Sequence, residues 1–206
     1  MDRELELSPV EIQSLRDRWY STIGQEIIRE MISQLREKRF EWVKSLSLLP
    51  PTSSTTPYPE ILDDLRGLEM SRLDLRNVSL SFFDLSFSKF DHCNLKGISL
   101  QGSKLSHSEF KNSNLSNADM LQIMADNSAF IDCKFIKAMM RMGDYRASRF
   151  VECSLIGSIL YDCNFSKAQF ESVELYKAKT DGAIFPNGFN IKNHLRNQPR
   201  NDRGFP

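Results

Sequence analysis

The chain has 206 residues, a formal net charge of zero and 40% hydrophobic residues. This balance is ordinary for one soluble globular domain with a small appendage. The absence of any run of 18 apolar residues excludes a membrane-spanning helix, and the acidic start lacks the basic and apolar pattern of a secretory signal. We therefore expect a cytoplasmic protein.

Residues 1–49 are predicted to form an amphipathic helical region. Ser8, Pro9 and Glu11 are typical of a helix start. An unbroken helix from there to Ser47 would be about 58 Å long. Two arrangements stay open: the helix breaks near residues 21–24 and folds back on its own domain, or it protrudes and pairs with another chain, as in a homodimer. The residues expected at the helix interface are Trp19, Ile23, Ile27, Met31 and Trp42.

The next segments are predicted to connect these helices to the main domain and to cover its first edge. Residues 50–59 are rich in Pro, Ser and Thr and predict a linker. Residues 60–69 are expected to be an N-terminal cap, with a short helix over residues 60–67 that protects an open sheet edge. We also expect Phe82, Phe83 and Phe87 to form the surface on which the N-terminal helices lie.

Residues 70–185 carry an apolar residue at every fifth position without one insertion. Twenty-two of these 24 positions are Leu, Phe, Met or Tyr, and the exceptions are Ala125 and Thr180. Neither a helix nor a strand has a period of five, so the pattern indicates a stacked solenoid. Small residues precede most centres by two positions, and Gly, Asn or Asp often follow a centre by two, as turns require.

A second period of 20 residues groups these centres into columns. One column has five phenylalanines above Met70, and another consists mainly of leucine. The expected core residues are Phe90, Phe110, Phe130, Phe150, Phe170, Leu95, Leu115, Phe135 and Leu155. Such columns predict a coil of 20 residues, and six stacked coils would form a rod about 28 Å long.

The repeat resembles the pentapeptide repeat family, as in Cys93-Asn94-Leu95-Lys96-Gly97 and Ser113-Asn114-Leu115-Ser116-Asn117. The resemblance covers residues 70–185. It implies a mainly β fold, a right-handed quadrilateral parallel β-helix of about six coils, here with an N-terminal α-helical extension. Some members of this family protect DNA gyrase by imitating the shape and charge of a DNA duplex.

The ends and the interior of the rod carry further expectations. Residues 186–206 are predicted to be a C-terminal cap and tail, with Phe189, Ile191 and Leu195 over the last coil and residues 197–206 disordered. All four cysteines stand at the small position, which predicts free thiols that fill the core rather than a metal set. Ile123 is large where the repeat has a small residue, and Ala125 is small where it has a large one. Gly143 and Tyr145 stack above them, so we expect either that a large residue fills the space left by a small one or that a shallow cavity forms.

The outer surface between residues 121 and 176 carries apolar residues where polar ones are usual. Together with one arginine they form a candidate partner-binding surface, since Met, aromatic and Arg side chains are enriched in interfaces. The candidate residues are Leu121, Met124, Met139, Arg141, Met142, Ile159, Tyr161, Ile136, Ile156 and Tyr176. By the period of 20, the last three line one side and most of the others the adjacent side.

No catalytic, metal or cofactor site is predicted. His92, His107 and His194 have no metal-ligand spacing, the carboxylates form no pair, and no phosphate-binding loop is present. The preferred function is a non-catalytic scaffold or adaptor with a protein partner of unknown identity. The alternative is a DNA-mimicking protein that protects gyrase and confers fluoroquinolone resistance. Charge argues against it, because residues 70–185 hold 14 Lys and Arg against 13 Asp and Glu. A third and weaker hypothesis is the binding of nucleic acid through Lys134, Lys137, Arg141, Arg146 and Arg149. Acidic residues lie among these basic ones and reduce the local positive charge.

Overall fold

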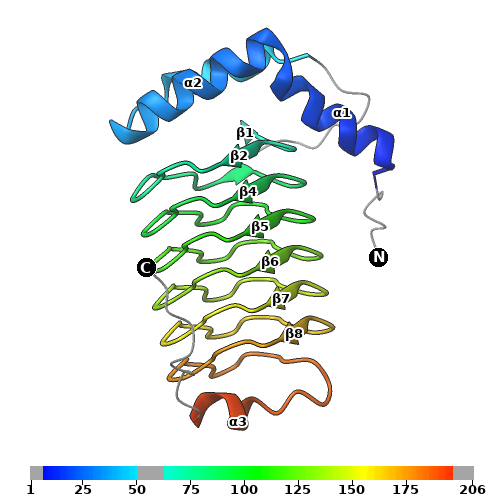
Figure 1. The fold of residues 1–206 in the computed structure, drawn as a ribbon, viewed down its shortest axis with the longest axis vertical. Helices are drawn as coiled ribbons and strands as arrows, with labels where there is room; N and C mark the ends of the chain where they lie inside the picture. The colour runs from blue at the N-terminus through cyan, green and yellow to red at the C-terminus, as the bar shows by residue number, and fades with distance from the viewer. Residues whose placement is uncertain (1–6, 51–62, 197–206) are drawn as a thin grey trace.

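The computed structural model describes residues 7–50 and 63–196. It is a rod of stacked coils with helices across one end and a short helix at the other (Figure 1). The predicted linker, residues 50–59, lies almost wholly outside the described residues, as does the tail beyond residue 196. None of the described helices is long and apolar enough to cross a membrane.

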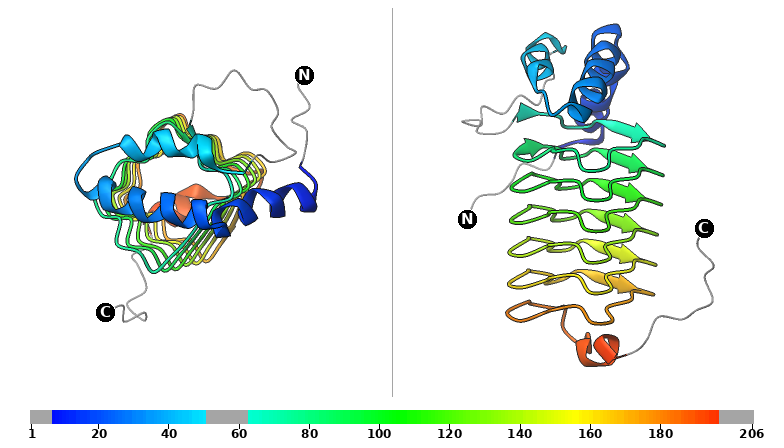
Figure 2. Two further views of the ribbon diagram at one scale, coloured as in Figure 1. Left: turned by 90° about the horizontal axis from the view of Figure 1, so that it is seen from above. Right: turned by 90° about the vertical axis from the view of Figure 1, so that its left-hand side faces the viewer.

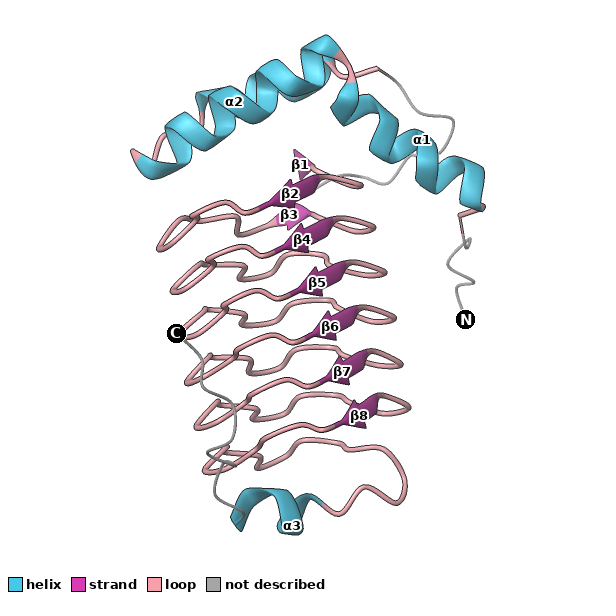
Figure 3. Cartoon of the chain, viewed as in Figure 1, coloured by secondary structure: helices cyan, strands magenta, loops and turns pink. Residues whose placement is uncertain are grey.

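The rod is a parallel β-solenoid. Six strands form its main sheet in the order β2, β4, β5, β6, β7, β8, and β1 pairs with β3 in a second sheet (Figure 3). The strand bounds are β1 Asp63–Asp64, β2 Glu69–Ser71, β3 Phe83–Asp84, β4 Lys89–Asp91, β5 Glu109–Lys111, β6 Ala129–Ile131, β7 Arg149–Val151 and β8 Gln169–Glu171. Every pairing joins residues 20 apart, as in Phe110 with Phe130. Five complete turns therefore separate β2 from β8, and the predicted mainly β fold of stacked coils is confirmed.

Each corner of the coil is a residue in the left-handed conformation, two positions after a buried centre. The φ angle is 58° at Asn77, 49° at Asn112 and 56° at Asn127. Asn reaches this region at low cost, which explains its frequency there. Phe82 and Met142 adopt the same conformation, with φ of 63° and 57°. Their N–H groups donate to carbonyls of the next coil at 2.9 Å, which holds the corner in place.

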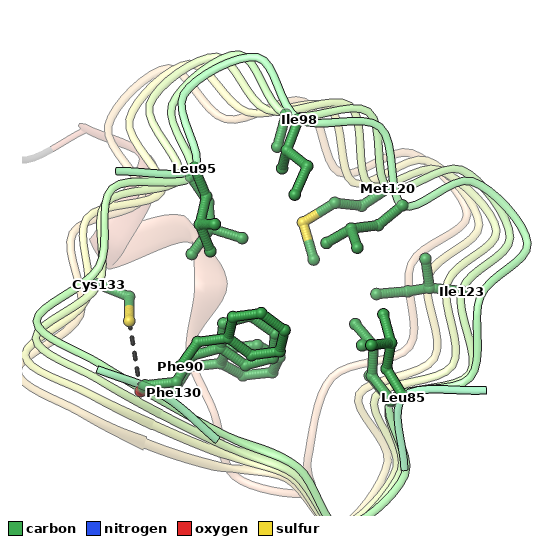
Figure 4. Close-up of a cluster of buried hydrophobic side chains, with 14 of the residues drawn as sticks. Leu85, Phe90, Leu95, Ile98, Met120, Ile123, Phe130 and Cys133 are labelled. Atoms are coloured by element: carbon green, nitrogen blue, oxygen red, sulfur yellow. Dashed lines mark hydrogen bonds between the residues drawn. The ribbon is translucent and has the colours of Figure 1, made fainter. Parts of the chain in front are cut away.

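The axis of the rod is filled by the predicted aromatic column (Figure 4). The ring centroids of Phe90, Phe110, Phe130, Phe150 and Phe170 follow one another at 4.6, 5.3, 4.9 and 5.3 Å. Leu95, Leu115, Phe135 and Leu155 are fully buried beside it. Because each ring is held between two others and the backbone coils are hydrogen-bonded above and below, the interior has no cleft that a substrate would need.

The N-terminal helices cover the first coil. Helix α1 is Pro9–Tyr20, α2 is Thr22–Arg36 and the 3-10 helix η1 is Glu41–Leu48. Ser21 ends α1 and caps α2, its hydroxyl accepting from the N–H of Gly24 at 3.0 Å. Figure 2 shows α2 and η1 side by side across the end of the rod. The break predicted near residues 21–24 is therefore present, and the helices pack on their own solenoid.

A network of polar contacts fastens this cap to the rod. Arg18 donates two bonds to the carboxylate of Asp64, both at 2.8 Å, and one to the carbonyl of Arg66. Trp19 donates through Nε1 to the same carbonyl at 2.8 Å. Gly67 lies so close to α1 that an added Cβ would be 2.8 Å from the carbonyl carbon of Leu15. Any larger residue at this position would collide with the backbone of α1, so the close packing of the cap on the first coil requires glycine here.

Two expectations about this end are wrong. Described residues of the predicted helix over residues 60–67 instead form strand β1 and a turn, because Leu65 is the centre of an earlier pentapeptide and is fully buried. The solenoid therefore begins by residue 63, not at residue 70, and α1, α2 and η1 form its cap. Of the three phenylalanines expected beneath the helices, Phe83 stacks on Trp42, whereas Phe82 lies over Gly102 and Phe87 stacks on His107.

The opposite end is covered by the segment that follows the last coil. Phe189 stacks on Phe185, with centroids 5.6 Å apart, and lies 4.8 Å from Phe170. Helix α3, Ile191–Arg196, brings Ile191 and Leu195 against the same cluster. Both open ends of the solenoid thus carry a cap, which prevents end-to-end pairing of the exposed backbone.

The interior residues that depart from the usual small and large positions of the repeat compensate for one another in volume. Ile123 and Tyr145 are buried, and a Cβ on Gly143 would lie 2.5 Å from the ring of Tyr145. The ring therefore occupies the space left by the glycine. The four cysteines are free and buried, and burial raises the pKa of Cys163 to about 12. These thiols are core fillers of low reactivity.

The Tyr145 hydroxyl is buried, and no hydrogen-bond partner reaches it among the described residues. We expect Tyr145→Phe to raise the free energy of unfolding by about 1 kcal/mol, because it removes an unpaired buried donor and keeps the ring that stacks on Phe165. Urea unfolding followed by circular dichroism measures this change. A lower midpoint for the variant would show that the hydroxyl has a partner in solution.

Candidate binding surface

The solenoid brings most of the candidate residues together on two adjacent sides. Met139 and Ile159 pair directly in neighbouring coils. The backbone stacks Leu121, Arg141 and Tyr161 beside them, as shown by the bonds from Gln122 N–H to Arg141 O and from Met142 N–H to Tyr161 O. Around the corner, Ile136, Ile156 and Tyr176 form the next column, linked in the same way. We call these two columns and the Met139–Ile159 pair the apolar surface.

Exposure varies across this surface. Met139 is 44% exposed, and Met142, at the corner that follows Arg141, is 51% exposed, while Ile159 and Tyr161 are half-buried against their neighbours. Met124 is also exposed but lies in another column, between Lys104 and Asp144. The structure therefore separates Met124 from the apolar surface, which runs along the rod for two to three coils.

The Met139–Ile159 pair lacks a bond from side chain to backbone that several other units of the rod make. Where the residue before a centre is Asp or Asn, its side chain accepts from the N–H two residues later. Examples are Asn114 to Ser116 at 3.0 Å, Asp119 to Leu121 at 3.2 Å and Asn164 to Ser166 at 3.0 Å. Met139 and Ile159 have no acceptor to offer. Within the part of the chain that the structure describes, the N–H groups of Arg141 and Tyr161 consequently make no hydrogen bond.

Positive charge lies around the same residues. The Arg141 guanidinium is 5.8 Å from the ring centroid of Tyr161, and the Lys177 ammonium is 4.9 Å from that of Tyr176. Lys137 stands at the corner between the two columns, its stem over Gly157. Lys179 continues the column of Ile159. In residues 7–50 and 63–196 none of these four cations forms a salt bridge.

The predicted helix-interface residues lie at the cap, not on the apolar surface. Trp19, Ile27, Met31 and Trp42 are buried in one cluster with the solenoid core. Ile23 was wrongly placed at the interface, because it is 41% exposed. The end of α1 lies against Gly24, with the carbonyl of Arg18 2.4 Å from the place of an added Cβ, and this contact turns Ile23 outward. The buried stripe is thus not free for a second chain.

The described residues offer little that could support catalysis or metal binding. No group of three His, Cys, Asp or Glu there is arranged to hold a metal. His92 pairs with Asp91 at 2.9 Å, and His194 stacks on Phe189, so both have structural contacts. A shallow hollow that is open to solvent lies along one side of α1 at Pro9, Gln13 and Asp17. The arrangement offers an extended binding surface rather than a reactive site.

The fold and this surface define a class of protein, a parallel β-solenoid with a filled interior and a modified outer side. The sequence model described as "Pentapeptide repeat region" matches residues 103–180. The matched residues lie within the solenoid, where the spacing of five predicted such a repeat. No curated protein sequence matches the chain.

Solved structures of pentapeptide repeat proteins are similar at low identity. HetL of the cyanobacterium Nostoc sp. strain PCC 7120, described as involved in heterocyst differentiation regulation, is 19% identical with a TM-score of 0.39, over 58% of this chain and 61% of HetL. The chain therefore spans less than two thirds of HetL. Rfr23 of the cyanobacterium Cyanothece 51142 is 16% identical with a TM-score of 0.36, over 59% of this chain and 87% of Rfr23. QnrB1, described as a plasmid-mediated fluoroquinolone resistance protein, is 17% identical with a TM-score of 0.34, over 62% of this chain and 87% of QnrB1.

Proposed function

We propose that the protein is a non-catalytic scaffold that binds a protein partner through the apolar surface. The observation that carries this proposal is the replacement of the polar residue before the centre by Met139 and Ile159 in consecutive coils, next to the column of Ile136, Ile156 and Tyr176. Scattered apolar residues are normal on a protein surface, but a contiguous patch of them indicates an interaction site. The stacked core beneath keeps this patch rigid, so little ordering entropy is lost on binding.

The cap supports the same proposal in a different way. Because α1, α2 and η1 bury their apolar stripe on the first coil, they do not cover the apolar surface, which lies further along the rod. These three helices therefore leave the surface open to a foreign chain. We place this function in the cytoplasm, since four free buried thiols suit a reducing compartment.

The alternative function, protection of gyrase by DNA mimicry, receives no support from the charge distribution. Residues 70–185 hold 14 basic and 13 acidic residues. Some of the carboxylates are already bonded to an arginine two residues later, as Asp74 to Arg76 and Asp144 to Arg146. A duplex mimic needs long rows of unpaired negative charge. The scaffold function therefore remains the better proposal.

A pull-down with tagged protein tests the proposal. We expect the Met139→Asp and Ile159→Asp double variant to lose partners that the wild type retains, because two charges are placed in the middle of the apolar contact. Phe82→Asn serves as the matched control, since Phe82 is 55% exposed and its left-handed φ of 63° suits asparagine. Equal recovery of every partner by wild type and double variant would overturn the proposed function.

A further inference from the structure

We propose that the apolar surface binds a second copy of this chain, packed antiparallel about a two-fold axis that passes between Met139 and Ile159. This inference rests on the proposed function, since it uses the same surface, and it names the partner. It follows from the order in which charged and apolar side chains succeed one another along the rod.

The surface as a whole is nearly neutral. In the four coils that span residues 114–182, its two sides and their corners carry five basic and four acidic residues. These are Lys134, Lys137, Arg141, Lys177, Lys179, Asp119, Asp162, Glu174 and Asp181. A balanced surface of this kind attracts neither a strongly acidic nor a strongly basic partner. The distinguishing feature is therefore the arrangement of the charges, not their sum.

One column of the surface has the order acid, apolar, apolar, base in four successive coils. Its residues, each bridged to the next, are Asp119, Met139, Ile159 and Lys179. An antiparallel second copy presents the same column in the reverse order. Asp119 then lies opposite Lys179 of the second copy, and Met139 lies opposite Ile159. Each contact between charges occurs twice, once at either end of an apolar centre, so the column complements itself.

The charged ends of this column cannot pair within one molecule. Three coil steps separate Asp119 from Lys179, which is about 14 Å at the stacking distance of about 4.8 Å. On the sheet side, by contrast, Lys89 and Glu69 occupy neighbouring coils, and their charged atoms lie 3.0 Å apart. Asp119 accepts from the N–H of Leu121 through one oxygen at 3.2 Å and has its other oxygen to offer to a second copy.

The adjacent column fits the same arrangement at its centre. Its residues in the same four coils are Leu121, Arg141, Tyr161 and Asp181. The antiparallel copy places Arg141 opposite Tyr161 of its partner, a pairing that the surface already makes within one chain, where the guanidinium lies 5.8 Å from the ring centroid. Leu121 and Asp181 are the unmatched pair, and they meet only at the two ends of the contact.

Other ways of packing the same sides match less well. A shift by one coil places Asp119 opposite Ile159, and a shift in the other direction places Lys179 opposite Met139. Each shift buries a charge against an apolar side chain, which is unfavourable. A parallel dimer, with its two-fold axis along the rod, brings Arg141 against Met139. The antiparallel register is the one that pairs both charges and keeps the apolar residues together.

The contact is short, and the dimer is consequently weak. Four coils of one side bury much less than the about 800 Å² per partner that a standard interface buries. We therefore expect a dissociation constant of about 10–500 µM. A dimer of this strength exchanges its subunits rapidly, which allows wild type and variants to be mixed.

Sedimentation equilibrium over a range from about 5 µM to about 1 mM tests the inference. We expect the mean mass of the wild type to rise with concentration from the monomer value of 23.8 kDa toward twice that value and no further, because a two-fold contact closes on itself. The double variant Met139→Asp with Ile159→Asp should keep the monomer mass throughout, since it places charges in the apolar centre.

The decisive variants exchange the two charges. Asp119→Lys and Lys179→Asp each set like charges opposite one another, so each variant alone should dimerise at least about tenfold more weakly than the wild type. An equimolar mixture brings opposite charges together at both ends, and the mixed dimer should form within about threefold of the wild-type affinity. Recovery in the mixture also shows that both variants are folded. Glu171→Lys makes the same change of charge on the sheet side, in β8, and should leave dimerisation unchanged.

The outcomes separate this inference from the proposed function. A wild type that stays monomeric over the whole range overturns the second copy, and so does a mixture of folded variants that dimerises no better than its components. Circular dichroism of each variant establishes the folding. The scaffold function still stands in either case if the pull-down separates wild type from the double variant, because that assay detects foreign proteins. Dimerisation that is lost in each charge variant and recovered in their mixture supports the inference.

Discussion

Replacing Phe130 by alanine is expected to lower the free energy of unfolding by about 3–5 kcal/mol. The ring is fully buried and lies 5.3 Å from Phe110, 4.9 Å from Phe150 and, edge on, 5.3 Å from Phe135. The cavity cannot close, because the pairing of β6 with β5 and β7 fixes the backbone on both sides. Urea unfolding followed by circular dichroism measures the loss.

Two controls make this result specific to the column. Ile131→Ala changes a half-buried outward residue of the same strand and should lower the free energy of unfolding much less. Phe170→Ala removes the partly exposed last ring of the column, and its loss of unfolding free energy should lie between those of Phe130→Ala and Ile131→Ala. If Phe130→Ala unfolds at the same urea concentration as Ile131→Ala, the stacked column does not hold the coils together. Because each coil contacts only its neighbours, the loss is also expected to reduce the cooperativity of unfolding.

The rod could be predicted from the sequence because its residue pattern is short and repeats along the chain. A residue of fixed size every five positions, with columns at 20, leaves one way to stack the chain, and Phe110 and Phe130 occupy the expected neighbouring places. The start of the solenoid was within reach of the same rule. Leu65 continues the series one step before Met70, and Gly67 is its turn residue. A helix was expected over residues 60–67 because a glycine there can also end a helix.

The contacts between the cap and the rod follow no such rule. Helical spacing shows which side of α2 is apolar, but not which surface it covers, and Arg18 and Asp64 are separated by 46 residues. Ile23 has the right spacing and is nevertheless exposed, because the bend at Ser21 and Gly24 turns it away.

The apolar surface was predictable as a group of columns, since column positions follow from the period. The unpaired N–H groups of Arg141 and Tyr161 were not. Their recognition requires knowing which backbone donors the coil itself satisfies, as in the bond from Leu121 to Asp119. Whether the surface binds a partner remains a prediction for the experiments described above.

Removing the charge of Asp64 is expected to loosen the N-terminal cap. Arg18 is 7% exposed and binds this carboxylate through both terminal nitrogens, and Arg66 binds it from the other side at 3.0 Å. Asp64→Ala leaves a buried arginine without a counter-ion, which costs about 3 kcal/mol when one partner of such a pair is removed. Limited proteolysis within residues 1–50 and urea unfolding measure the release of the cap.

The same contact makes the stability of the cap depend on pH. Burial alone would raise the pKa of Asp64, but the hydrogen bonds and charges of Arg18 and Arg66 outweigh it and hold the pKa well below its ordinary value of 3.8. A carboxyl whose pKa is lower in the folded state binds fewer protons there than in the unfolded state below pH 3.8. Its contribution is therefore complete above that pH and is lost as the pH falls further.

A comparison with Asp64→Asn isolates this contribution, because Glu69 at the same interface also has a lowered pKa and titrates in both proteins. Burial would raise the pKa of Glu69, and its bonds with Tyr20 and Lys89 lower it. We expect the stability difference between wild type and Asp64→Asn to be constant from pH 7 to about pH 5 and to shrink as the pH falls below 3.8. A difference that does not change down to pH 2 would show that the Asp64 carboxylate does not hold the cap through its charge.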